Sequence, residues 1–275
     1  MDKKENLYMM PRELGVVAMF YNRTLFRRAG LADPDPNWNY NDLLKMAKKL
    51  TVKDKNGKTI QYAFNGMYTW PGLYAPMVAS FGGSIISKDG KRSTLSSKES
   101  LKGLHALIDL ISVHKVALAP NASGAVPGSD TFSSGLVAMQ PCTYSQVALY
   151  RSTMKKYDWD IAIMPAGPVK RCINMGSSGY GISRDCKHPR EAWMFMKYIV
   201  GTDMQKEMGK CGLGIPVLKS LKNDPCWRKE GLPPKNMDAF IETLKYGMRW
   251  RDILLFMKPE ASDAYSEAFE KSYLG

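Results

Sequence analysis

The sequence predicts an α/β fold, because short strand-like runs of apolar residues alternate with amphipathic helical patterns. The strand-like runs lie at residues 16–21, 60–64, 137–139 and 160–164. A length of 275 residues is enough for one large domain or two modest ones. With 44% apolar and 11% aromatic residues, the composition indicates a globular protein and excludes a disordered or fibrous one.

Two helices are expected in the first half of the chain. Asn39 is a suitable N-cap for a helix that runs to Leu50. Ser96 and Glu99 form a capping box that opens a second helix. The spacing of apolar residues predicts which face of each helix is buried. For the first helix this face is Leu43, Leu44, Ala47 and Leu50, and for the second it is Leu101, Leu104, Ile108 and Ile111.

Helices also follow the last predicted strand. Pro189 suits the first position of a helix. Thr202 is the expected cap of the next helix, which Gly209 or Gly212 would end. From residue 237 onward helices are expected to dominate. Three aromatic residues of this region are expected in the core: Trp159, Trp193 and Phe195.

No segment of the sequence predicts membrane insertion or export. The longest apolar run, residues 16–20, is far shorter than the ~20 residues that a membrane-spanning helix needs. Charged residues open the chain, but the apolar stretch of a signal peptide does not follow them. Taken by itself, this sequence would stay in the cytoplasm.

The charge of the chain is strongly basic, with 39 Lys and Arg against 26 Asp and Glu and a formal net charge of +13. Such an excess of positive charge is typical of proteins that bind a nucleic acid or an anionic surface. The basic residues are scattered, however, and their densest clusters are pairs such as Arg27 with Arg28. A solvated basic surface is therefore the preferred interpretation, with nucleic-acid binding as the alternative.

The reactive residues do not form a catalytic or metal-binding motif. Five cysteines without a CxxC pair favour buried, reduced thiols over a zinc ribbon or a disulfide scaffold, with one long-range disulfide left open. The glycine-rich residues 176–181 lack the spacing of a phosphate loop or a nucleophile elbow. The three histidines, at 105, 114 and 188, lack metal-ligand spacing. The chain is therefore predicted to be a non-enzymatic protein without cofactor or metal.

Four groups of short segments carry a recognisable pattern. The first is LYMMP at 7–11 with FYN at 20–22 and LFRRAGL at 25–31, and the second is FSSGLVAM at 132–139. The third is WDIAIMPAGP at 159–168 with GSSGYGIS at 176–183 and KHPREAWMF at 187–195, and the fourth is GLGIPVLKS at 212–220. Together, and in this order, they resemble the family 1 extracellular solute-binding proteins, which include the maltose-binding proteins.

The resemblance implies the type II fold of periplasmic binding proteins, with two α/β lobes that are joined by crossing strands and close over a ligand. It assigns residues 11–165 and 216–275 to the C-terminal lobe, and residues 1–10 and 166–215 to a remnant of the N-terminal lobe. The family carries a longer region before the LYMMP segment, so the chain looks truncated at its N-terminus. Absent strands would leave sheet edges and apolar faces uncovered.

A sugar site needs flat aromatic rings against the apolar face of a pyranose and polar groups around its hydroxyl rim. The resemblance offers four rings, each of which also has a structural interpretation as a core or helix-face residue. They are Tyr68, Trp70, Tyr144 and Tyr265. Met67 stands where maltose binders carry a stacking aromatic residue, which argues against a maltodextrin ligand.

The polar candidates lie on the two segments that the resemblance identifies as crossing between the lobes. Glu13 would accept hydrogen bonds from sugar hydroxyls. Arg12 beside it would donate one, or would be a solvated hinge charge. Gly176, Ser177 and Ser178 lie on the returning segment, where small residues let the backbone approach a ligand; the alternative is an ordinary turn.

The sequence thus predicts a protein that captures a mono- or oligosaccharide between its lobes and delivers it to the membrane permease of an ABC importer. In full-length form such a protein is expected to be a monomer, extracellular or periplasmic, and anchored to the membrane as a lipoprotein. The alternatives are a binding protein of the same architecture for an anionic solute, a peptide or a polyamine, a basic nucleic-acid-binding protein, and a glycan-active enzyme with two facing carboxylates.

Overall fold

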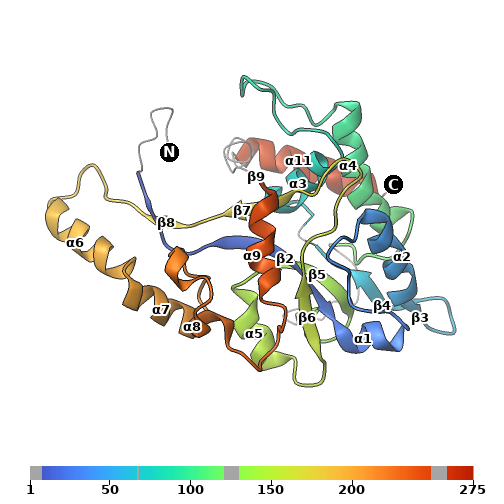
Figure 1. Ribbon diagram of the computed structural model, residues 1–275. Coiled ribbons are helices and arrows are strands. Elements are labelled where there is room, and N and C mark those ends of the chain that lie inside the picture. The colour runs from blue at the N-terminus through green and yellow to red at the C-terminus, as the bar shows by residue number, and fades with distance from the viewer. Residues whose placement is uncertain (1–7, 67, 121–129, 249–258, 275) are drawn as a thin grey trace.

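A computed structural model describes residues 8–66, 68–120, 130–248 and 259–274. Its centre is a mixed sheet in the order β3-β4-β5-β2-β7-β9, in which β6 also pairs with β2, and helices cover both faces of this sheet (Figure 1). A separate two-stranded ribbon joins β1 and β8. The strands are β1 Met10–Pro11, β2 Gly15–Asn22, β3 Val52–Lys53, β4 Thr59–Phe64, β5 Val137–Thr143, β6 Trp159–Ala162, β7 Ile173–Gly176, β8 Gly179–Tyr180 and β9 Gly247–Met248.

The helices differ widely in length. The α-helices are α1 Arg23–Arg28, α2 Tyr40–Leu50, α3 Pro71–Ser80, α4 Lys98–Ser112, α5 Gln146–Thr153, α6 Pro189–Ile199, α7 Thr202–Cys211, α8 Pro225–Arg228, α9 Asp238–Thr243 and α11 Pro259–Leu274. Two short 3-10 helices are η1 Lys219–Leu221 and η2 Leu244–Tyr246. No helix among these described residues is long and apolar enough to span a membrane.

Strand β2 is buried on both faces, which explains its uninterrupted apolar sequence. Side chains alternate along a strand, so Val17 and Met19 point into one core while Val16 and Phe20 point into the other. The first core lies under α2, α3, α4 and α11. The second lies under α5 and α9, and in it the ring of Phe20 stacks on that of Trp159 at 5.8 Å. The sequence therefore packs one strand between two helical layers.

The predicted elements of the first half are largely confirmed. Asn39 caps α2, and it forms a reciprocal capping box with Asp42. The cap of α4 is Ser97, which accepts a hydrogen bond from the Ser100 amide, so the expected box at Ser96 was wrong by one residue. The predicted buried face of α4 was right in part: Ile111 is buried, Leu104 and Ile108 are partly buried against the core, and Leu101 is exposed. The face that packs on α3 instead contains Gly103, Ala106, Leu107 and Leu110.

In the second half, the predicted helix start at Pro189 and the predicted helix end at Gly212 are confirmed. Pro189 begins α6, and Gly212 ends α7 in the left-handed conformation. Thr202 is the first residue of α7 rather than its cap. Trp159 lies in the core, but Trp193 and Phe195 do not, since α6 lies outside the main body of the protein (Figure 1). Their assignment to the core was therefore wrong.

The five cysteines are free thiols in this structure. Cys226 is buried, whereas Cys211 is exposed on α7. The expectation that all the thiols are buried was therefore wrong. Helices α6 and α7 together form an arm that extends away from the main sheet (Figure 1), and Cys211 is exposed on this arm.

The contact between α3 and α4 gives a direct test of this packing. A Cβ atom on Gly103 would lie 2.5 Å from the Cα atom of Val78. Helix propensity alone would make Gly103→Ala stabilising by up to about 1 kcal/mol. We expect this variant instead to lose about 1–3 kcal/mol in urea unfolding, because the backbones of two helices must separate.

Lys102→Ala is the matched control for this test, since Lys102 is the exposed neighbour on the same helix. Its unfolding free energy should change by less than about 0.5 kcal/mol. A stabilised Gly103→Ala protein would contradict the close contact of α3 with α4.

Candidate functional site

The candidate site lies where two chain segments cross between the sheet and the arm of α6 and α7. Residues 10–16 run antiparallel to residues 175–180, with Met10 paired to Tyr180 and Gly15 paired to Gly176. Between these pairs the Arg12 amide donates to the Ser178 carbonyl at 2.8 Å. A Cβ on Gly15 would lie 2.9 Å from the carbonyl oxygen of Gly176, so glycine is what allows this close crossing. We call these two segments the hinge ribbon.

The side chains of the hinge ribbon form one polar cluster. The Ser178 hydroxyl donates to the Glu13 carboxylate, and the Ser178 amide donates to the same oxygen at 3.3 Å. The other oxygen of Glu13 accepts a hydrogen bond from Arg12 Nε. The Ser177 hydroxyl donates to the Glu13 carbonyl at 2.5 Å. The structure therefore brings together five of the predicted residues: Arg12, Glu13, Gly176, Ser177 and Ser178.

These contacts fix the ionisation of the cluster. Burial opposes the charged form of Glu13, but the hydrogen bonds from Arg12 and Ser178 outweigh it and hold the Glu13 pKa below its ordinary value. The hydrogen bond to Glu13 in turn raises the Arg12 pKa. Both groups are therefore charged at neutral pH. The Arg12 side chain is still 43% exposed, so the hinge presents a cation to solvent beside a satisfied carboxylate.

Gln205, which sequence reasoning missed, supports the cluster from α7. Its side chain is fully buried, and its Nε2 atom donates to the Arg12 carbonyl at 2.8 Å. Its Oε1 atom accepts from the Val217 amide at 2.9 Å. The sequence of α7 does not distinguish Gln205 from its polar neighbours, because its burial and both of its hydrogen bonds depend on tertiary contacts.

Trp70 lies at the start of α3, the helix that packs against strand β7. It is the N-cap residue of α3, it is partly buried, and its ring covers Gly72. Gly72 lines a small cavity together with Val17 and Asn174, and Asn174 is two residues from Gly176. The end of α3 that carries Trp70 therefore lies beside the returning strand β7.

Tyr68 belongs to the core rather than to a cleft surface. Its ring stacks on Phe269 at 5.5 Å, its carbonyl accepts from the Tyr265 hydroxyl at 3.4 Å, and burial raises its pKa strongly. The Tyr68 hydroxyl is buried and has no hydrogen-bond partner among the residues that the structure describes. Met67, whose identity argued against a maltodextrin, lies outside the described residues.

Tyr144 is not brought together with Trp70. It is 2% exposed, its hydroxyl donates to the Trp227 carbonyl at 2.9 Å, and it belongs to the core on the other face of the sheet. In this structure the Tyr144 ring thus has no face open to a ligand. Its ring packs edge-on against Trp227 and Phe240 in that core.

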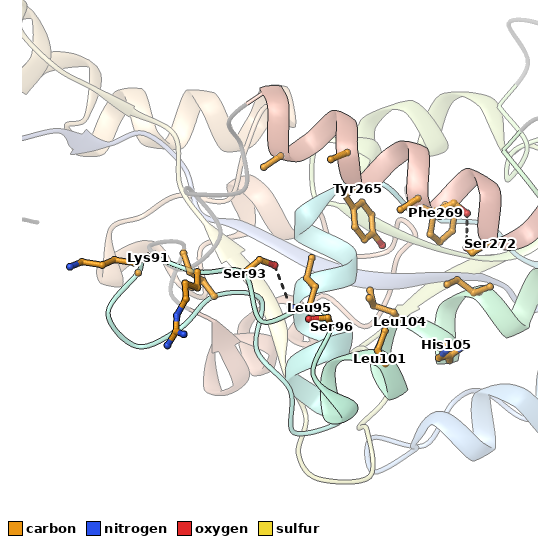
Figure 2. A pocket seen from close by; sticks show the side chains of 17 residues that line it. Lys91, Ser93, Leu95, Ser96, Leu101, Leu104, His105, Tyr265, Phe269 and Ser272 are labelled. Atoms are coloured by element: carbon orange, nitrogen blue, oxygen red, sulfur yellow. Dashed lines mark hydrogen bonds between the residues drawn. The ribbon is translucent and has the colours of Figure 1, made fainter.

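Tyr265 lines a hollow of about 720 Å³ between α4, α11 and residues 86–96 (Figure 2). Its ring stacks on Tyr74 at 3.9 Å and is almost fully buried. The face of α4 that lines this hollow is the one the sequence predicted as core: Leu101, Leu104 and Ile108. The α4 and α11 sides of this hollow are mainly apolar, and its polar side chains lie mostly at residues 91–96, with His105 and Ser272.

Two further hydroxyls lie at the carboxyl end of β5. Thr143 Oγ1 and Ser145 Oγ are 2.8 Å apart, and both residues are partly or fully accessible just before α5 begins. Thr143 pairs with Val17, the residue that directly follows the first segment of the hinge ribbon. Ligands of α/β folds commonly bind outside the carboxyl ends of strands, and this position was the signal that sequence reasoning overlooked. The described residues contain no group of three or more side chains that could hold a metal ion.

Comparison with known proteins identifies the family of this chain. Residues 1–206 match the family model described as "Bacterial extracellular solute-binding protein". A Deinococcus radiodurans protein described as "Probable ABC transporter-binding protein" is 25% identical over 227 residues, which cover 79% of this chain and 53% of the relative. The chain therefore spans about half the length of the curated relatives that it matches.

Solved structures share the fold. An ABC substrate-binding protein of Listeria monocytogenes in complex with cycloalternan has a TM-score of 0.79 at 22% identity, covering 97% of this chain and 70% of that one. A maltose/maltodextrin-binding domain of Bdellovibrio bacteriovorus bound to maltotriose has a TM-score of 0.71 at 19% identity, covering 96% and 72%. A Mycobacterium tuberculosis protein in complex with glycerophosphocholine has a TM-score of 0.74 at 16% identity, covering 97% and 65%.

These likenesses confirm the predicted fold, which is that of the type II periplasmic binding proteins with strands crossing between two lobes. The family model matches three quarters of the sequence, and this match establishes the family as well as the fold. The chain belongs to the bacterial extracellular solute-binding proteins.

Proposed function

We propose that the protein binds a mono- or oligosaccharide at the hinge ribbon and delivers it to the permease of an ABC importer. The observation that carries this proposal is the polar cluster of Arg12, Glu13 and Ser178 on the crossing strands. Neighbours in complex with cycloalternan and maltotriose support a sugar as the ligand class.

The chemistry of the cluster suits a hydroxyl-rich ligand. Arg12 keeps exposed donors while Glu13 holds it in place, and carboxylate oxygens can accept more than one hydrogen bond each. The hydroxyls of Ser177, Thr143 and Ser145 add groups that both donate and accept. Trp70 would supply the flat apolar surface for the C–H face of the sugar. Tyr68 and Tyr144 would support the site from the core rather than contact the ligand.

A solute with an anionic group is the second candidate. Arg12 is an exposed cation in a chain of net charge +13, and one neighbour of the same fold is in complex with glycerophosphocholine. Raising the salt concentration separates the two candidates. Affinity for a neutral sugar should change little, whereas affinity for an anion at this partly exposed guanidinium should fall.

The wider setting follows from family membership. We propose an extracellular or periplasmic location for the whole protein, and a membrane permease as its partner. We further propose that residues 11–165 and 216–275 form the C-terminal lobe, with residues 1–10 and 166–215 contributing to the other lobe. In this arrangement the hinge ribbon is the connection about which the lobes close.

Calorimetric titration against a glycan panel tests the sugar site. Trp70→Ala should weaken binding of the best glycan by about 1–3 kcal/mol, because it removes the stacking surface. Trp70→Phe should recover much of that loss. Trp193→Ala, which removes an exposed indole from α6, is the matched control and should bind like the parent protein. Absence of binding to every glycan, or equal affinities for parent and Trp70→Ala, would refute the sugar site.

The charge of Glu13 should appear in the pH dependence of stability. Its pKa is lowered by folding, so its contribution is fully present above the unfolded value of about 4.3 and is lost as the pH falls through the lower folded value. At pH 7, Glu13→Gln should cost on the order of 1 kcal/mol in urea unfolding, given partial solvent screening. This difference should shrink towards pH 3, and a difference independent of pH would show that the charge is not involved.

A further inference from the structure

The hollow between α4 and α11 is a second space of ligand size, separate from the hinge ribbon. Its volume of about 720 Å³ lies in the range of roughly 300–1,000 Å³ that small-molecule sites occupy. Alanines at positions 261, 264 and 268 line the α11 wall, and Leu101 and Leu104 line the α4 wall. Leu101 is 41% exposed there. Apolar surface that is hollowed and open to solvent favours the binding of an apolar group.

The charged groups that line this hollow are cationic. Lys91 and Arg92 line it, and no Asp or Glu is among its described lining residues. Neither cation forms an ion pair with any residue that the structure describes. The nearest acid in the sequence, Asp89, accepts hydrogen bonds from the Ser87 hydroxyl and the Lys91 amide in its own turn. Residues 91–92 therefore bring an excess of positive charge to the hollow.

The cationic and apolar parts of the hollow lie in sequence along its length (Figure 2). Lys91 is at one end, Leu95 and Leu104 are in the middle, and His105 and Ser272 are towards the other end. An apolar channel with positive charge at one end complements a molecule that has a hydrocarbon chain and a single anionic head.

We propose that this hollow, which we call the α4–α11 site, binds a fatty-acid anion. The acyl chain lies against Leu101, Leu104 and Ile108, and the carboxylate lies beside Lys91 and Arg92 at the rim. Burial of the chain supplies the affinity, and charge-assisted hydrogen bonds from the two cations orient the head. No described residue of the hinge ribbon lines the α4–α11 site, so this proposal goes beyond sugar binding and is independent of it.

Fluorescence titration of the whole chain with cis-parinaric acid, followed by displacement with saturated fatty acids below their micelle concentrations, tests the site. From octanoate to laurate, affinity should rise about fourfold for each added methylene, because each one is transferred from water to the apolar channel. Methyl laurate, which has the same chain and no charge, should bind about fivefold more weakly than laurate.

Two variants locate the ligand within the site. Ala268→Trp fills the channel and should weaken laurate binding about tenfold or more; Glu267→Trp, at an exposed neighbour that does not line the hollow, is its control. Lys91→Ala with Arg92→Ala should weaken laurate about fivefold and leave methyl laurate unchanged. The control for this charge change removes two exposed lysines of α2, at positions 48 and 49.

Methyl NMR of the parent protein gives a readout that needs no variant. Laurate should shift the methyl signals of Leu101, Leu104 and Ile108. Absence of binding, equal affinities for laurate and methyl laurate, or equal affinities of Ala268→Trp and Glu267→Trp would overturn the proposal. Binding to phosphatidylglycerol vesicles without binding to free laurate would also overturn it, since the partner would then be a membrane surface. A glycan titration of the same sample is scored separately, so failure of the sugar site leaves this result intact.

Discussion

The antiparallel crossing of residues 10–16 with residues 175–180 is the constraint on which the rest of the structure depends. It connects the main sheet to the arm of α6 and α7, and it places Glu13 opposite Ser178. The crossing needs glycine at position 15, since a side chain there would meet the Gly176 carbonyl. A single backbone arrangement thus determines both the course of the chain and the position of its polar cluster.

The main body gives this crossing a rigid base. Strand β2 continues from the hinge ribbon straight into the sheet, where the two cores bury both of its faces. Residues 12–14 and 177–178 lie between the paired regions of the crossing. Gln205 connects α7 to the backbone of Arg12, so the arm and the cluster are expected to move together. The polar groups of the cluster lie on the crossing segments themselves.

Local sequence signals predicted the elements that local chemistry determines. The cap at Asn39, the start of α6 at Pro189 and the end of α7 at Gly212 depend on a few neighbouring residues. The polar residues of the hinge ribbon were also found, because the resemblance places them on crossing segments. The alternation of strands and helices was sufficient for the fold class.

Other features depend on tertiary contacts that cannot be predicted from the periodicity of the sequence. Helix α4 has apolar residues on two sides, and only the packing of Gly103 against α3 decides which side is core. Tyr144 packs edge-on against Trp227 and Phe240, which lie far from it in the sequence. Trp193 and Phe195 have the composition of core residues, but nothing in the described chain covers them. Periodicity identifies an apolar face, while the partner of that face is set by tertiary contacts.

The central claim is that the ligand binds at the crossing strands. The most direct measurement is an amide NMR titration of the labelled protein with maltotriose and with cycloalternan, the glucans in complex with its structural neighbours. Binding at the hinge ribbon predicts shifts concentrated at the amides of Gly176, Ser177 and Ser178. Shifts confined to the hollow between α4 and α11, or no shifts with either glucan, would contradict it.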